Sequence, residues 1–211
     1  TMLIAVPTGV KIFNWLATMW KGSMTFETPM LFAVGFIFVF TMGGFTGLIC
    51  AMAPIDIQIQ DTYYIVAHFH YVLVAGSLFA LFAGAYFWLP KWTGHMVDER
   101  LGKWHFWTSM IFFNVTFFPM HFLGLAGMPR RYADYPMQFA DFNMVASIGA
   151  FGFGLSQLIF LWAVLKAIKG GPKASPNYYD AQDDGLEWTV PSPAPFHTFE
   201  TPPKIEWKHV H

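Results

Sequence analysis

Charged side chains are scarce in this sequence of 211 residues. Only 12% of the residues are Asp, Glu, Lys or Arg, whereas a soluble domain carries about 25%. The formal net charge of −1 gives no basic surface of the kind that binds nucleic acid, so we expect no nucleic-acid partner. The single cysteine, Cys50, excludes an intrachain disulfide and a cysteine-ligated zinc site. The N-terminal run lacks the features of a signal peptide, and we expect it to begin inside a helix.

Long apolar runs take the place of charge. Hydrophobic residues make up 55% of the chain and aromatic residues 19%. Several charge-free runs reach the roughly 20 residues that a helix needs to cross a bilayer. The pattern predicts an all-α membrane protein, a polytopic transmembrane helix bundle of four full spans plus a partial first span. We expect spans at about 1–19, 29–52, 63–89, 104–126 and 142–168.

Two groups of glycines lie within the predicted spans. Gly43 and Gly47 are four residues apart, and Gly149, Gly152 and Gly154 form a second cluster. Small residues at such spacings let membrane helices approach each other closely. We therefore expect both groups to serve helix packing.

The composition changes after residue 170. The segment 171–211 is rich in proline and charge, which predicts an extended surface tail. Short connections on the tail's side of the predicted bundle contain most of the cations, and positive charge is typical of the inner face. The tail is therefore expected to face the inside, and Arg130 and Arg131 lie unusually on the outer face.

The run "YIVAHFHYVL" at 64–73 contains two histidines, His68 and His70, inside a predicted span. Residues two apart on a helix point about 200° apart, so the pair does not suit one small metal site. It suits two cofactors on opposite sides of one helix, with Phe69 between them. Haem iron is commonly held by an axial histidine. The alternative is a pair of core histidines bonded to neighbouring carbonyl groups.

Charged residues gather on the outer face around this helix. Adjacent Arg130 and Arg131 in "GMPRRYADYP" suit carboxylates or phosphates such as haem propionates, or lipid headgroups. Asp56 and Asp61 in "APIDIQIQDTYY" suit helix capping, a bond to a propionate, or a hard cation.

Lys11 is a lone cation within the first apolar run, and Thr8 lies about one turn before it on the same side. An intramembrane lysine often marks a proton or ion path. The alternative is that the span ends near Lys11 and the side chain reaches toward the interface.

The stretches "DTYYIVAHFHYVL", "HFLGLAGMPRRYADYP" and "AVPTGVKIFNWLATMW" resemble subunit I of haem-copper cytochrome c oxidase. The resemblance covers residues 1–170 and implies the end of helix eight, helices nine to twelve and the tail. It implies that His68 is the axial ligand of the high-spin haem and His70 that of the low-spin haem. Phe69 would lie between the two haems, and Arg130 and Arg131 would bond their propionates.

The resemblance also implies roles for five further residues. Lys11 matches the lysine of a proton-uptake pathway and Thr8 its neighbouring threonine. Asp56 matches a carboxyl group near a propionate of the high-spin haem. Asp61 matches a ligand or neighbour of a magnesium site, but Gln60 stands where the family usually has a histidine ligand. Gln60 and Asp61 are therefore the residues on which magnesium binding would depend.

By this resemblance the chain implies an enzyme that requires more than its own residues. The family's copper-ligating histidines and the second axial histidine of the low-spin haem would precede residue 1. We expect two haems a, copper B completed by residues outside this chain, and a proton-pumping oxidase that passes electrons from cytochrome c to O2. The implied partners are the N-terminal part of subunit I, subunits II and III, cytochrome c and the lipid bilayer.

The expected activity is that of cytochrome-c oxidase in the respiratory chain, absent until the missing part completes the site. The location would be the mitochondrial inner membrane or a bacterial plasma membrane. Two alternatives remain at this point: a quinol oxidase of the same superfamily, and a non-catalytic membrane scaffold.

Overall fold

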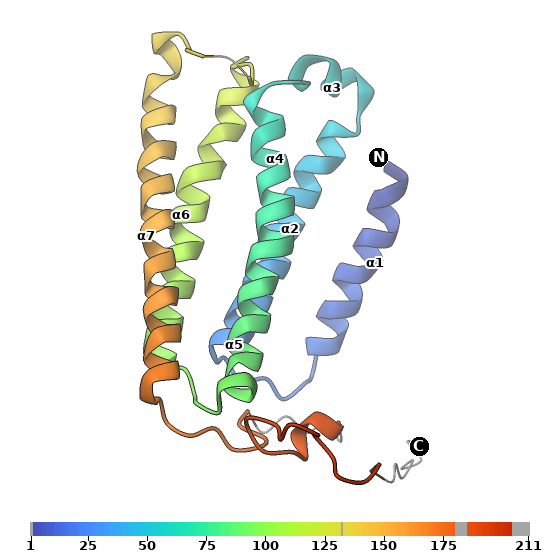
Figure 1. The fold of residues 1–211 in the computed structure, drawn as a ribbon. Coiled ribbons are helices and arrows are strands. Elements are labelled where there is room, and N and C mark those ends of the chain that lie inside the picture. Colours follow the sequence, from blue (N-terminus) through green and yellow to red (C-terminus); the bar gives the residue numbers. More distant parts are fainter. Residues whose placement is uncertain (1, 132, 180–184, 204–211) are drawn as a thin grey trace.

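The protein is a bundle of long helices, seen in Figure 1. The computed structural model describes residues 2–131, 133–179 and 185–203. Across these ranges the chain is helical and has no strand, only two isolated bridges. The α-helices are α1 (Met2–Met19), α2 (Thr28–Cys50), α3 (Ala53–Ile59), α4 (Tyr63–Leu73), α5 (Ala80–Thr93), α6 (Glu99–Leu125) and α7 (Ala140–Gly170). A π-helical segment, Val74–Phe79, joins α4 to α5, and short 3-10 turns occur at Met137–Phe139 and Leu186–Trp188.

Five helical stretches in the described part of the chain are long and apolar enough to cross a membrane. They are Met2–Met19, Thr28–Cys50, Tyr63–Thr93, Glu99–Leu125 and Met137–Gly170. The predicted fold class, an all-α polytopic membrane bundle, is confirmed. The continuous stretch Tyr63–Thr93 combines α4, the π-helical segment and α5, and it places both candidate histidines in its first third.

Helix α6 begins earlier than its apolar run, at Glu99 and not near 104. The side chain of Asp98 accepts hydrogen bonds from the backbone N–H groups of Arg100 at 2.9 Å and Leu101 at 3.4 Å. This cap satisfies N–H groups that the first helical turn leaves without partners. The charged first turn of α6 is therefore helical although it carries no membrane-spanning signal.

The segment before α4 differs from the simple connection that the sequence suggests. Residues 53–59 form the short helix α3, with Pro54 in its first turn. Capping of α4 by Asp61 is wrong: the cap is Thr62, whose hydroxyl accepts from the N–H of Tyr64 at 3.2 Å. Asp61 instead adopts a φ of +56° at the corner between α3 and α4. Its carboxylate is thereby left free for contacts outside the helix.

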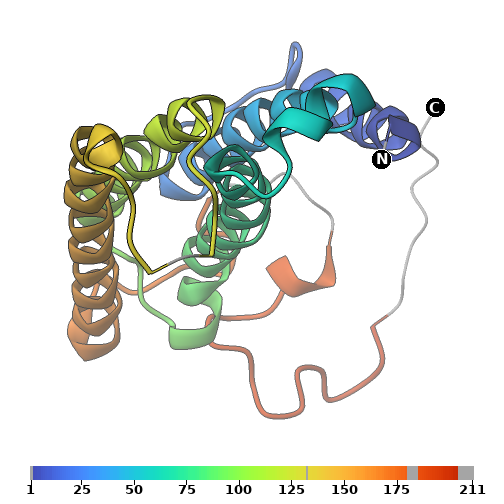
Figure 2. The same ribbon diagram turned by 90° about the horizontal axis from the view of Figure 1, so that it is seen from above.

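Seen from above, α7, α6, α2 and α1 follow one another in a curved row, and α4 lies against its concave side (Figure 2). The lower half of the bundle is closed by an aromatic core centred on Phe32 of α2. This ring is fully buried and packs against Phe82 and Tyr86 of α5 and Phe106 of α6. Aromatic pairs in such arrangements add to the free energy of burial alone.

Glycines let the helices approach where the structure is most closely packed. A Cβ at Gly149 of α7 would lie 2.6 Å from the backbone N of Thr116, and one at Gly152 would collide with the Phe112 ring, both on α6. Gly154 has nothing within 4 Å. The expected packing role therefore holds for Gly149 and Gly152 but is wrong, within the described residues, for Gly154.

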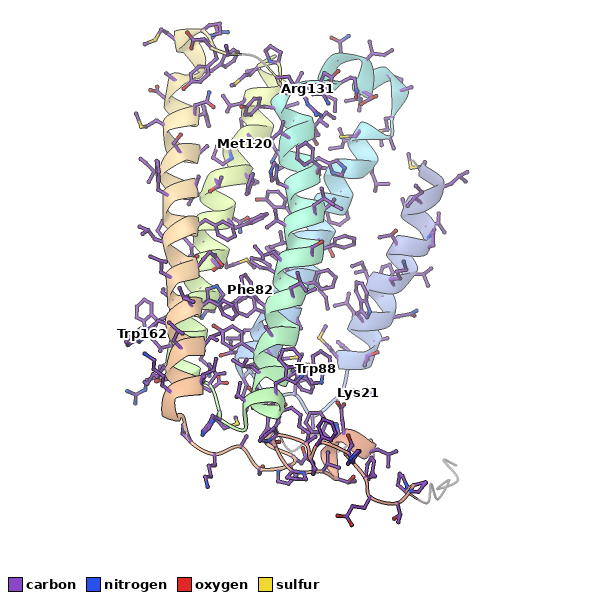
Figure 3. All side chains as sticks on the ribbon, in the orientation of Figure 1. Lys21, Phe82, Trp88, Met120, Arg131 and Trp162 are labelled. Carbon is purple, nitrogen blue, oxygen red and sulfur yellow. The ribbon has the colours of Figure 1, made fainter. Side chains whose placement is uncertain are left out.

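The described part of the tail lies across the lower end of the bundle (Figure 1). Lys91, buried at the end of α5, donates hydrogen bonds to the carbonyl oxygens of Pro176 at 3.0 Å and Val190 at 2.8 Å. Figure 3 labels Lys21 at this end and Arg131 at the opposite end. The tail and the arginine pair thus lie at opposite ends of the bundle.

Candidate functional site

His68 points from α4 toward α2. Its Nδ1 lies 3.0 Å from the carbonyl oxygen of Gly43 and 3.1 Å from Oγ1 of Thr46. A carbonyl oxygen only accepts, so Nδ1 carries the hydrogen and, in the neutral ring, Nε2 carries the lone pair. The half-buried imidazole is therefore fixed in the tautomer that presents Nε2 as a ligand atom.

The His68 ring depends on a glycine for its place. A Cβ at Gly47 would lie 2.9 Å from Cε1 of His68, closer than ordinary van der Waals contact. A Cβ at Gly43 would lie 3.0 Å from the backbone of Tyr71. The predicted packing role of this glycine pair is thus sharpened: Gly43 admits the α4 backbone and Gly47 admits the histidine ring.

His70 lies against a different helix. Its Nδ1 donates to the carbonyl oxygen of Val66 at 2.7 Å, one turn earlier in α4. Its ring stacks on Phe117 of α6, with centroids 4.2 Å apart and an interplanar angle of 15°. Nε2 again carries the lone pair in the neutral ring. The two-residue spacing has separated the rings between α2 and α6, as helical geometry predicts.

Phe69, Asp61 and Arg130 are brought together at the upper end of α4. The guanidinium of Arg130 lies 5.7 Å from the centroid of the Phe69 ring. Its Nε is 3.8 Å from Oδ1 of Asp61, and its backbone N–H donates to the Asp61 carbonyl at 2.9 Å. The Phe69 ring in turn lies 4.5 Å from that of His70. The Phe69 ring therefore lies between the Arg130 guanidinium and the His70 ring.

Arg131 and Asp56 flank this arrangement. Arg131 is exposed and has a φ of +65°, so it extends from the turn that follows α6. Asp56 is half-buried in α3. Both residues are at the end of the bundle that holds the candidate histidines.

Gln60 and Asp61 do not form a metal site by themselves. Both side chains are exposed at the corner between α3 and α4. The described residues contain no group of three His, Cys, Asp or Glu side chains placed to hold a metal ion. Because magnesium prefers six oxygen ligands, an ion here would need ligands from water or from outside this chain.

Lys11 and Thr8 lie apart from the histidines on α1, which contacts the bundle mainly through α2. The Thr8 hydroxyl donates to the Ile4 carbonyl at 2.8 Å, and Lys11 is exposed. Residues three apart are neighbours on a helix surface. Thr8 is half-buried on the side of α1 that faces the bundle, whereas Lys11 is not covered by the rest of the described chain.

Two buried histidines of α6 are not among the candidate site residues that the sequence indicates. His105 is fully buried and lies 3.1 Å from the Tyr86 hydroxyl and 3.4 Å from Oε1 of Gln157. His121 is nine-tenths buried and contacts the rings of Tyr64 and Tyr71. Their presence inside an apolar span was the available signal, because intramembrane ionisable residues are expensive to bury.

The chemistry of the donor set fits haem iron. An axial histidine binds iron through one ring nitrogen while the other nitrogen donates to a carbonyl or carboxylate. In His68 and His70, Nδ1 is bonded to a backbone carbonyl, which leaves Nε2 able to hold iron, and Arg130 supplies a cation of the kind that would pair with a propionate. The fold and site define a polytopic membrane protein with two histidines on one transmembrane helix, each with Nδ1 bonded to a backbone carbonyl.

The comparisons with known proteins agree with that class. The family described as "Cytochrome C and Quinol oxidase polypeptide I" matches residues 1–152. The chain belongs to this family. It is therefore related to the haem-copper oxidases. Membership of this family implies haem and copper as cofactors.

Individual relatives are similar over the whole chain. Cytochrome c oxidase subunit 1 of Cereibacter sphaeroides is 53% identical over 212 residues, covering 100% of this chain and 38% of the relative. A probable cytochrome c oxidase subunit 1-beta of Nocardia farcinica is 51% identical, covering 97% and 35%. This chain therefore spans a little over a third of the length of these curated relatives.

A solved structure supports the fold alone. A cryo-EM structure of a haem-copper terminal oxidase dimer matches with a TM-score of 0.61 at 18% identity. The match covers 69% of this chain and 27% of that chain. The helix arrangement is thus that of one part of a larger oxidase subunit.

Proposed function

We propose that this chain is the C-terminal, haem-ligating part of the catalytic subunit of a terminal oxidase that reduces O2 to water. The carrying observation is the pair of intramembrane histidines, each with Nδ1 bonded to a backbone carbonyl and Nε2 left as a ligand atom. Two relatives more than 50% identical are named as subunit 1 of cytochrome c oxidase. Cytochrome c is accordingly the proposed electron donor.

His68 would bind the high-spin haem and His70 the low-spin haem, both of them haem a. These haems, with copper B held by residues outside this chain, supply electron transfer and O2 reduction. The backbone carbonyls of Gly43 and Val66 hold the two imidazoles in fixed orientations. Phe69 contacts the His70 ring and would lie between the two cofactors.

At the outer end of the site, the positive charge of the arginines would balance the negative charge of the haem propionates. Arg130 and Arg131 would bind propionates, and the contact with Asp61 helps to hold the Arg130 guanidinium over Phe69. Asp56 lies at the same end of the bundle. Its carboxyl group would be near a propionate of the high-spin haem. Asp61 and Gln60 would contribute to magnesium binding only together with ligands from another chain or from water.

Proton uptake is proposed to use Lys11 and Thr8 of α1. Lys11 supplies the ionisable group, and Thr8 supplies a hydroxyl one turn away. A proton path suits these two residues because the rest of the subunit would cover Lys11 and exclude bulk water. The end of the bundle that carries the tail and most lysines would face the inside of the membrane. The pump would take protons from this side.

The complete assembly would contain the N-terminal part of subunit I and subunits II and III. The described chain alone does not complete either haem site or the copper site, so we expect no activity from it in isolation. The bacterial relatives favour a bacterial plasma membrane as the location. The multi-pass topology itself rests on the five apolar helices.

A quinol oxidase is the second candidate because the matching family includes both kinds of enzyme. Oxygen consumption by the purified complete complex separates the two. We expect turnover with reduced cytochrome c and little with a quinol, and loss of turnover in a His68→Ala complex that still assembles. Turnover with quinol alone would favour the second candidate, and no haem absorption in the assembled complex would favour a scaffold.

A further inference from the structure

Thr46 lies where α2 contacts α4, beside the candidate ligand His68. The two helices run side by side (Figure 1), and the Thr46 side chain is half-buried between them. Its Oγ1 is 3.1 Å from Nδ1 of His68 and 2.8 Å from the carbonyl oxygen of Gly43. The same carbonyl oxygen is 3.0 Å from Nδ1. The imidazole nitrogen, the hydroxyl and the carbonyl oxygen therefore form a closed triangle of hydrogen-bonding contacts.

The donors and acceptors of this triangle follow from the carbonyl group. The Gly43 oxygen only accepts, so the Thr46 hydroxyl and Nδ1 of His68 both donate to it. With its hydrogen directed at Gly43, Oγ1 of Thr46 still has lone pairs, and it accepts from Nδ1 at 3.1 Å. The single hydrogen on Nδ1 is thus shared between two acceptors, and a shared hydrogen is poorly aligned with each of them.

Thr46 differs in this respect from other threonines of the bundle. A threonine in a helix commonly satisfies its hydroxyl on the carbonyl four residues earlier, which needs no partner from another helix. Six threonines in the described helices do so: Thr8, Thr18, Thr41, Thr93, Thr108 and Thr116. Thr46 bonds instead to the carbonyl three residues earlier, and its oxygen contacts a histidine ring on another helix. Local satisfaction of the hydroxyl therefore does not account for its placement.

We propose that Thr46 is a positioning residue that weakens the hydrogen bond from His68 to Gly43 and thereby sets the strength of the bond between His68 and iron. The hydroxyl acts in two ways. It takes a share of the Nδ1 hydrogen, and it occupies a lone pair of the Gly43 oxygen. Groups bonded to the second nitrogen of a ligating histidine tune its basicity and orientation. The inference rests on the proposed haem ligation by His68.

Loss of the Thr46 hydroxyl has an effect of definite sign. The Gly43 oxygen becomes the sole acceptor for Nδ1 and no longer accepts from Thr46, so the bond between them straightens and strengthens. The imidazole of His68 then gains anionic character, and its bond to iron strengthens. His70 is unaffected, because its Nδ1 donates to the Val66 carbonyl of its own helix at 2.7 Å.

The test is resonance Raman spectroscopy of the reduced complete oxidase, which measures the iron–histidine stretch of the high-spin haem. We expect Thr46→Val, which keeps the volume and removes the hydroxyl, to move this band to higher frequency. Thr46→Ser keeps the hydroxyl and should leave the band near its wild-type position. Thr41→Val is the matched control on α2, because that half-buried hydroxyl donates to the Ile37 carbonyl at 2.6 Å and has no recorded contact with His68. Low-spin haem absorption should be unchanged in all three variants.

A band that stays in place or moves to lower frequency in Thr46→Val overturns the proposal, as does an equal shift in Thr46→Ser or Thr41→Val. If Thr46→Val does not assemble, Thr46→Ala removes the same hydroxyl without adding bulk beside the Gly43 carbonyl and decides by the same criterion. Failure of the proposed function is distinct from these outcomes, because the iron–histidine band would then persist in a His68→Ala complex whatever residue stands at position 46.

Discussion

Substitution of Gly47 by alanine should disturb the high-spin haem and spare the low-spin haem. The added Cβ would lie 2.9 Å from Cε1 of His68, whereas ordinary contact begins at 3.4 Å. The imidazole or helix α2 must then move by roughly half an ångström, which is about the positional tolerance of a functional site. Nδ1 is held on the Gly43 carbonyl, so the ring cannot retreat without weakening that bond. Overpacking of this kind costs about 1–3 kcal/mol.

Gly44→Ala is the matched control. The position is next in sequence and on the same helix, but a Cβ there meets nothing within 4 Å in the described chain. Alanine within a helix is favoured over glycine by roughly 0.5–1 kcal/mol. The assay is the carbon monoxide difference spectrum of the purified complete oxidase, normalised to its low-spin haem. We expect a reduced or shifted signal in Gly47→Ala only, and equal spectra for both variants would refute the reasoning.

Three further predictions concern the stability of the bundle. Gly124→Ala places a Cβ in collision with the backbone of Tyr64, so the yield of folded complex should fall sharply relative to Gly154→Ala, which meets open space. Lys91→Met leaves two tail carbonyls without their charged donor; the cost is about 1.5–3 kcal/mol per bond, and limited proteolysis should cut the tail faster, an unchanged rate being the contrary result. The hydrogen bond from Lys166 holds the pKa of Asp98 below its usual value. Its stabilisation is therefore present above the unfolded pKa of about 3.9 and lost as the pH falls through the lower folded pKa. Thermal unfolding of Asp98→Asn, which keeps a capping side chain, should lack this acid-dependent loss, and identical pH profiles would argue against it.

The membrane spans could be predicted from the sequence because charge-free apolar runs depend only on composition. Their ends could not, since they depend on local caps. The cap at Asp98 extends α6 into a charged turn, and the short helix before α4 carries no periodic signal over its seven residues. A polar residue next to a helix start is also ambiguous: Asp61 and Thr62 are both good caps by type, and only the backbone shows which one serves.

The part of the candidate site that lies on one helix could be predicted from the sequence. The spacing of His68 and His70 sets their divergence, because helical geometry is fixed. The partners of their rings come from other helices or from hydrogen bonds that the sequence does not specify, as with Gly43 on α2 and Phe117 on α6. The polar contacts of buried His105 could not be predicted for the same reason, because they come from Tyr86 on α5 and Gln157 on α7.

The central claim is that His68 and His70 ligate two different haems from one helix. The direct measurement is the set of reduced-minus-oxidised and carbon monoxide difference spectra of complete oxidase carrying His68→Ala or His70→Ala. The account predicts that His68→Ala removes the oxygen-reactive haem and largely spares the low-spin haem, and that His70→Ala removes the low-spin signal. Retention of both haems in either assembled variant would contradict it.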